Sequence, residues 1–263
     1  MKRTYEMIVS HDGTKLRLRR DLLEDAKGVM VICHGRGASM DTPQYTFMTD
    51  GFEGAGYSVY IFDHRGHGES EGPRGFYNDY PELIGDIKVM VDLAKAENPD
   101  KKIFLFGNSM GGFGTEVFAC MYPGYVDGVI LAVSAIPGKP EKPVKPDGDL
   151  TETIVINKKS STGELEQNQR VLTSPGLEYA MANGWYWLWS NHQKLADPVL
   201  MLSAEKDEYF HPAEALALFN DIASTDKMLK IYGGSTHKLY GGPAGPEVLA
   251  DTIAWLNVRS SRQ

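Results

Sequence analysis

Residues 102–112 read KIFLFGNSMGG, an apolar run that leads into a serine with glycines on both sides. The run at 102–107 predicts a buried strand, and the pattern that follows predicts a helix over 109–122. The glycines allow a sharp turn from strand to helix that lifts Ser109 above the edge of a sheet. The stretch therefore predicts a strand, a tight turn and a helix that together expose a nucleophile.

The rest of the chain repeats this alternation of strand and helix. Short apolar or β-branched runs, typical of strands buried on both faces, lie at 28–34, 57–62, 126–134, 197–203 and 227–232. Further helical patterns lie at 79–97, 211–223 and 244–258. Each parallel connection needs a crossover, so the order predicts an α/β fold whose mostly parallel sheet of about eight strands has helices on both faces. Residues 5–9 and 14–20 predict an antiparallel hairpin at its edge.

The alternation fails between about residues 135 and 195, a length that requires structure of its own. We interpret 135–195 as a cap inserted into a body made of residues 1–134 and 196–263. The insertion opens with prolines spaced by three and interleaved with lysines, at Pro137, Pro140, Pro143 and Pro146. This period matches a stiff polyproline II strut, although an ordinary proline-rich loop explains it equally well.

Composition excludes several classes of protein. The 263 residues are 42% hydrophobic and carry a formal net charge of −8, so a nucleic-acid partner gets little support. Two cysteines, Cys33 and Cys120, rule out a disulfide scaffold and fit a reducing compartment. Neither a signal peptide nor an apolar run of 18 residues is found, so we expect a cytoplasmic enzyme or binding protein. The sequence does not indicate its oligomeric state.

A serine hydroxyl becomes a nucleophile when a histidine removes its proton and an acid orients that histidine. Asp207 follows the strand 197–203, where a carboxylate would stand at the carboxyl edge of the sheet. His237 follows the strand 227–232 and could reach the same edge. Ser109, Asp207 and His237 are therefore the predicted triad, with Glu205 and Glu208 as alternative acids.

Acyl transfer also needs two N–H donors directed at the developing oxyanion. The backbone N–H of Met110, at the start of a helix, is one candidate. The second is the N–H of Arg36 in His34-Gly35-Arg36-Gly37, which follows the strand 28–34. The Arg36 side chain could meet an anionic group or make a solvated or structural pair.

A second histidine pattern stands in the stretch DHRGHGES at 63–70, where His64 and His67 have a spacing that could suggest a metal site. No helix places these two side chains on one face, so we interpret the stretch as a structural loop. We predict neither a metal ion nor an organic cofactor.

Taken together, these motifs resemble the α/β-hydrolase superfamily, and within it the monoacylglycerol lipase and lysophospholipase branch, which is serine aminopeptidase S33-like. The matching stretches are HGRG at 34–37, DHRGHGESEG at 63–72, GNSMGG at 107–112, the acid loop at 203–207 and DKMLKIYGGSTH at 226–237. The resemblance implies that Ser109 is the nucleophile, that Asp207 and His237 complete its triad, and that the amides of Arg36 and Met110 form the oxyanion hole.

Three departures from this branch are visible. Asn108 stands where His is common before the nucleophile, and Ala38-Ser39 stands where Glu-His often follows HGRG. Residues 209–211 lack a cysteine that some animal relatives carry nearby. The second departure concerns the surroundings of the glycerol group, and so selectivity for monoacylglycerol.

The expected function is hydrolysis of small acyl esters, such as monoacylglycerol or lysophospholipid, through an acyl-enzyme. The alternatives are amide or peptide hydrolysis or perhydrolysis on the same triad, or a non-catalytic ligand-binding relative. Gly35 and the cluster of Trp185, Trp187 and Trp189 are candidate substrate contacts. The tryptophans could line an acyl tunnel, touch a lipid interface transiently, or pack the cap against the body.

Overall fold

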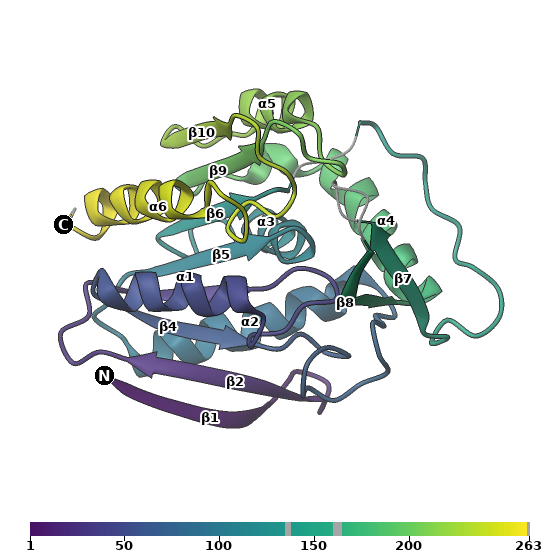
Figure 1. Ribbon diagram of the computed structural model, residues 1–263, viewed down its shortest axis with the longest axis horizontal. Helices are drawn as coiled ribbons and strands as arrows, with labels where there is room; N and C mark the ends of the chain where they lie inside the picture. Colours follow the sequence, from purple (N-terminus) through teal and green to yellow (C-terminus); the bar gives the residue numbers. More distant parts are fainter. Residues whose placement is uncertain (135–137, 160–164, 262–263) are drawn as a thin grey trace.

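The computed structural model describes residues 1–134, 138–159 and 165–261 (Figure 1). An eight-stranded sheet has the order β1-β2-β4-β3-β5-β6-β9-β10. Its strands are β1 Lys2–Val9, β2 Lys15–Leu22, β3 Gly28–Cys33, β4 Tyr57–Phe62, β5 Ile103–Asn108, β6 Gly128–Ala132, β9 Val199–Ala204 and β10 Lys227–Tyr232. Pairing is parallel from β4 to β10, while β1 and β2 form an antiparallel hairpin at the edge. The predicted α/β sheet and its edge hairpin are confirmed.

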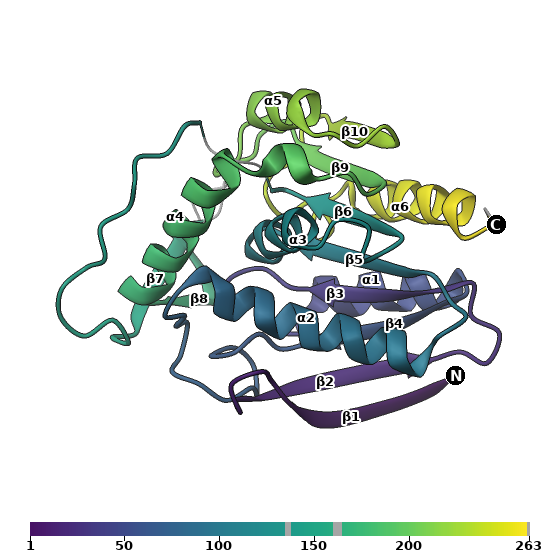
Figure 2. The same ribbon diagram turned by 180° about the vertical axis from the view of Figure 1, so that it is seen from behind.

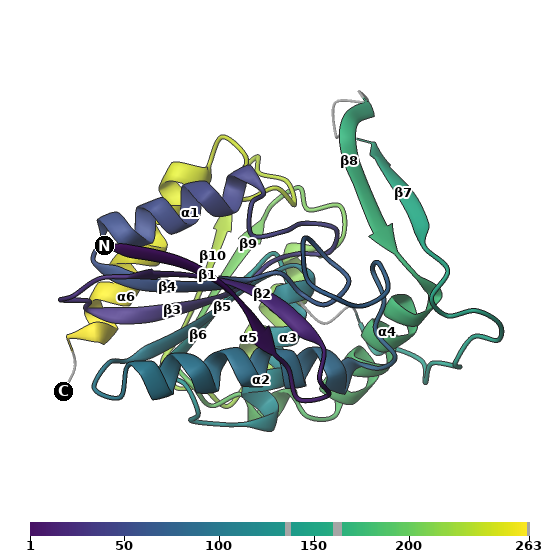
Figure 3. The ribbon, with the colours of Figure 1, turned by 90° about the horizontal axis from the view of Figure 1, so that it is seen from below.

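Helices cover both faces of this sheet (Figures 2 and 3). Helices α1 (Pro43–Gly54) and α6 (Gly245–Ser260) cover one face, and α2 (Tyr80–Glu97), α3 (Met110–Met121) and α5 (Pro212–Asp221) cover the other. Every residue of the central strands β3, β4, β5, β6 and β9 is buried, which explains their unbroken apolar runs. None of the described helices combines the length and apolar character needed to cross a lipid bilayer.

The segment between β6 and β9 contains a hairpin of β7 (Ile154–Lys159) and β8 (Leu165–Thr173), then α4 (Pro175–Trp189) and the short turn η1 (His192–Lys194). Helix α4 packs against α2 and α3, and the hairpin extends away from the sheet beyond α4 (Figure 3). Both lie at the end of the molecule opposite the chain termini (Figure 1).

The proline-rich stretch precedes this hairpin. Pro137 lies outside the described residues, but Pro140, Pro143 and Pro146 are each half-buried while the residues between them are exposed. A burial period of three is that of a polyproline II turn. The prolines therefore share one side of the stretch, and Pro143 and Pro146 face α4.

Candidate active site

Ser109 lies between β5 and α3 in a backbone conformation that L-residues rarely adopt, with φ 54° and ψ −116°. The turn requires glycine at two positions. A Cβ on Gly107 would overlap the carbonyl of Gly111, and a Cβ on Gly111 would overlap that of Cys33. A second strained residue lies on the neighbouring strand end, where buried Val133 has φ 44° just after β6. The sharp turn that the glycines predict is present, and it holds the serine at the carboxyl end of β5.

His237 lies between Ser109 and Asp207. Its Nε2 is 2.9 Å from the Ser109 Oγ, and its Nδ1 is 3.0 and 2.9 Å from the two carboxylate oxygens of Asp207. The Asp207 side chain is fully buried, and its Oδ1 also accepts the backbone N–H groups of Tyr209 and Phe210. Asp207 accepts a hydrogen bond from the Nδ1–H of His237 in this arrangement, so the Nε2 lone pair is available to the serine hydroxyl.

The two alternative acids hold the same loop by other contacts. Glu205 accepts the backbone N–H of Gly234 at 2.6 Å, and Glu208 accepts the backbone N–H of His237 at 3.3 Å. Of the three acids, Asp207 is the one whose carboxylate contacts the imidazole. His211, the other histidine that follows these acids in the sequence, instead caps α5, where its Nδ1 accepts the N–H of Ala213.

The two predicted oxyanion donors come from elements that meet at Ser109. Met110 is the first residue of α3, so its N–H has no acceptor inside the helix. The loop that carries Arg36 lies against the serine, since a Cβ on Gly35 would be 3.4 Å from the Ser109 Cβ. Gly35 in turn donates its N–H to the hydroxyl of Tyr45 at 2.7 Å. The Arg36 side chain reaches α4, where it forms an ion pair with Glu178.

Three buried histidines lie beneath this loop. The rings of His34 and His64 are 4.4 Å apart, and those of His34 and His67 are 5.4 Å apart. Burial lowers the pKa of His34 to about 4 and that of His67 to about 3, and it also lowers the pKa of His64. Across the described ranges, no group of three or more His, Cys, Asp and Glu side chains is arranged to hold a metal ion.

The tryptophans of α4 have three different environments. Trp185 packs edge-on against Phe113 and Phe210, with ring centroids 5.7 and 6.2 Å away. Trp187 packs against Tyr80, and the Lys194 ammonium lies over its ring. Trp189 is 36% exposed and borders His192. Trp185 is the member of the cluster closest to the site, since Phe210 also contacts the His237 ring.

Sequence reasoning missed four residues at this site: Phe113, Glu178, Tyr209 and Phe210. The Tyr209 ring lies edge-on to the His237 ring, with the two ring centroids 4.7 Å apart. Two of the four had a sequence signal, because Phe113 follows Ser109 by one helical turn and Phe210 follows Asp207 closely. Glu178 had none, since it meets Arg36 across 142 residues of sequence.

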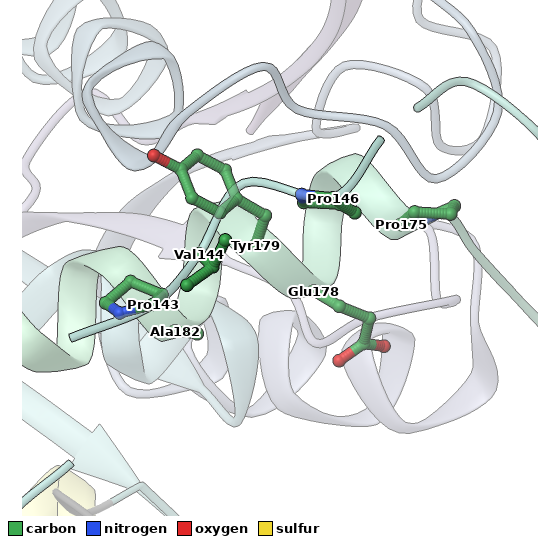
Figure 4. Close-up of a pocket in the computed structure, with 7 residues that line it drawn as sticks. All are labelled: Pro143, Val144, Pro146, Pro175, Glu178, Tyr179 and Ala182. Atoms are coloured by element: carbon green, nitrogen blue, oxygen red, sulfur yellow. The ribbon is translucent and has the colours of Figure 1, made fainter. Parts of the chain in front are cut away.

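An open pocket of about 340 Å³ lies on α4 beside the proline-rich stretch (Figure 4). It is lined by Pro143, Val144, Pro146, Pro175, Glu178, Tyr179 and Ala182. Ser109, Asp207 and His237 are absent from this lining, so the pocket is separate from the serine site. Glu178 lies at the boundary, because it lines the pocket and also binds Arg36.

Comparison with known proteins identifies the family to which this sequence is similar. The model of the family described as "Serine aminopeptidase, S33" matches residues 24–243. The monoacylglycerol lipase of Mycolicibacterium smegmatis is 25% identical, covering 88% of this chain and 89% of that protein. The mouse monoglyceride lipase is 27% identical, covering 81% of this chain and 76% of that protein. A thermostable carboxyl esterase from Bacillus coagulans has the same fold, with a TM-score of 0.80, 18% identity and 99% coverage of both chains.

Proposed function

Because the chain belongs to the serine aminopeptidase S33 family and is a serine hydrolase of the lipase and esterase type, we propose that it hydrolyses small acyl esters at Ser109. The observation that carries the proposal is the continuous chain of contacts from Ser109 through His237 to Asp207. In this proposal Ser109 is the nucleophile, His237 the general base and Asp207 the group that orients the imidazole.

The reaction proceeds in two steps. The Ser109 oxygen attacks the ester carbonyl carbon while His237 Nε2 takes the hydroxyl proton, and the charge on the carbonyl oxygen is held by the amides of Arg36 and Met110. The tetrahedral intermediate then collapses, and His237 gives its proton to the departing alcohol. Water attacks the acyl-enzyme with His237 again as base, which releases the acid and restores Ser109.

We propose a monoacylglycerol or a related small acyl ester as the substrate class. The support is that the named relatives are monoacylglycerol and monoglyceride lipases. The residues from 135 to 195 would act as a cap on a body of 1–134 and 196–263. In support, Phe113, Trp185 and Phe210 join α3, α4 and the acid loop in one apolar cluster beside His237.

A fluorophosphonate probe and a panel of p-nitrophenyl and monoacylglycerol esters test the proposal. We expect the wild-type protein to be labelled and to hydrolyse the esters, and Ser109→Ala to lose both properties. Ser261→Ala, which changes a serine at the end of α6, is the control and should behave as wild type. A matched set of aminoacyl anilides separates ester from amide hydrolysis. A wild-type protein that neither reacts with the probe nor turns over any substrate would instead support a non-catalytic binding role.

A further inference from the structure

The side chain of Arg36 ties the loop of one proposed oxyanion donor to helix α4. Its guanidinium forms an ion pair with Glu178, and the same carboxylate accepts a hydrogen bond from Thr173 Oγ1 at 3.0 Å. The Arg36 side chain is 22% exposed and that of Glu178 is 52% exposed. This pair therefore joins the body to the inserted segment beside Ser109.

The other contacts of this loop hold the residues on either side of the turn but do not restrain the side chain of Arg36 at its tip. Gly35 is held on both sides, by its N–H to Tyr45 and by its carbonyl, which accepts bonds from His34 Nδ1 at 2.8 Å and the Ala38 N–H at 3.2 Å. Arg36 and Gly37 form the turn between these anchors, and Gly37 has φ 71°. The ion pair with Glu178 is thus a restraint on Arg36 itself, the residue whose N–H must point at the oxyanion.

Helix α4 is a firm support for that restraint because other contacts hold it to the body. Asn183 donates to both carboxylate oxygens of Asp79 at 2.7 and 2.9 Å, and Ser174 donates to the carbonyl of Gly75 at 2.8 Å. Leu177, next to Glu178, is fully buried. Glu178 is therefore presented from a helix whose position does not depend on Arg36.

We propose that Glu178 is a positioning residue for the oxyanion loop, acting through the Arg36 side chain; this inference rests on the proposed esterase function. An oxyanion donor stabilises the charge that develops in the transition state more than the neutral carbonyl of the bound ester. A loosened Arg36 should therefore lower kcat and leave KM nearly unchanged. A pair at the surface has a modest effect, so we expect a loss of about three- to tenfold.

The test compares Glu178→Ala, Arg36→Ala and the double variant on one p-nitrophenyl ester, with kcat and KM measured separately. Each single variant should lose about three- to tenfold in kcat, and the double variant should lose no more than either, because both changes remove the same contact. The charge-swapped pair Arg36→Glu with Glu178→Arg should recover part of the loss. The rate of phosphonate labelling should fall in parallel, since that reaction uses the same donors.

Asn183→Ala is the matched control, because it removes one anchor of α4 while the Ser174 hydrogen bond, the buried Leu177 and the ion pair between Arg36 and Glu178 remain. We expect this variant to keep the wild-type kcat. An equal loss in Asn183→Ala would overturn the proposal in favour of general docking of α4, and so would additive losses or an effect confined to KM. An active wild type with unchanged Glu178 variants defeats this inference alone, whereas an inactive wild type defeats the proposed function and this inference with it.

Discussion

His34 accepts a hydrogen bond at its Nε2 from the backbone N–H of His64, at 3.0 Å. The ring proton must then be on Nδ1, which donates to the Gly35 carbonyl. A second proton on Nε2 would place two donors opposite each other. The loop that carries Arg36 therefore depends on a neutral histidine.

This dependence predicts loss of stability in acid. The native pKa of His34 is lowered to about 4 and that of His67 to about 3, whereas the ordinary value is 6.5. Below pH 6.5 the unfolded chain binds more protons than the native state, so the free energy of unfolding falls as the pH drops from 6.5 towards 4. Each of these two histidines lowers the free energy of unfolding by at most about 1.4 kcal/mol for each unit of pH. Denaturant unfolding at several pH values measures the slope, and a flat profile between pH 7 and 4.5 would contradict the prediction.

Glu116 on α3 predicts an opposing trend between pH 4.5 and 8, a range that overlaps that of the histidines below pH 6.5. It is fully buried, neither of its carboxylate oxygens has a hydrogen-bond partner in the part of the chain that the structure describes, and burial raises its pKa to about 8. Between pH 4.5 and 8 the native state retains a proton that the unfolded chain has lost, so stability falls as the pH rises through this range. Glu116→Gln removes that loss. The gain in melting temperature should be larger at pH 8.5 than at pH 5, and an equal gain at both would argue against a buried proton.

Asp207 and Glu208 give a direct comparison of two neighbouring acids. Asp207→Asn keeps the shape of the side chain but favours the wrong tautomer of His237, so kcat should fall by about 10³- to 10⁴-fold. Glu208→Gln changes an acceptor of the His237 backbone N–H and should cost less than about threefold. Steady-state kinetics on one ester decide the matter. Comparable losses in the two variants would remove the distinction between these acids.

Trp185 and Trp189 should differ in their effect on substrate choice. Trp185 joins the apolar cluster beside His237, so Trp185→Ala should lower kcat/KM for medium-chain esters by about tenfold and leave acetate esters nearly unchanged. Trp189 is more exposed and borders His192, so Trp189→Ala should keep the wild-type profile. A series of p-nitrophenyl esters of increasing chain length provides the measurement. The same profile in both variants would exclude Trp185 as a determinant of acyl length.

Gly176 tests how closely α4 must approach the body. A Cβ there would overlap the Phe76 ring and lie 2.8 Å from the Tyr77 carbonyl oxygen, so Gly176→Ala should cost about 1–3 kcal/mol of stability. Gly54, in the last turn of α1, has open space around it. Gly54→Ala should therefore be neutral or slightly stabilising. Thermal unfolding of the two variants makes the comparison, and equal melting temperatures would contradict the close approach.

Much of the fold could be read from the sequence because the central strands are buried on both faces and so appear as unbroken apolar runs. Helix α1 was missed. Its buried residues Tyr45, Met48 and Phe52 have helical spacing, but threonine, aspartate and glycine separate them and weaken the pattern. Neither the β7–β8 hairpin nor α4 was predicted, because the alternation of apolar strands and one-sided helices that marks the body stops at about residue 135.

The residues of the candidate site likewise fall into those that the sequence predicts and those that it does not. Ser109, Asp207 and His237 each follow a strand of a parallel sheet, so their meeting at one edge follows from the order of the strands. The contact between Arg36 and Glu178 depends on how α4 docks, which no local pattern records. Sequence reasoning reached the residues that topology brings together. It missed Glu178, which packing alone joins to the site, and it also missed Phe113 and Phe210, although each stands close in sequence to a predicted triad residue.

The backbone at Ser109 sets thermodynamic stability against activity. Glycine adopts a positive φ without a steric penalty, so Ser109→Gly should yield a more stable protein that lacks the proposed nucleophile. Val133, held at φ 44° on the adjacent strand end, is a second strained residue that lowers stability in the same region. Selection for heat resistance alone would favour the loss of the serine, and an engineered thermostable form should gain its stability at positions outside this turn.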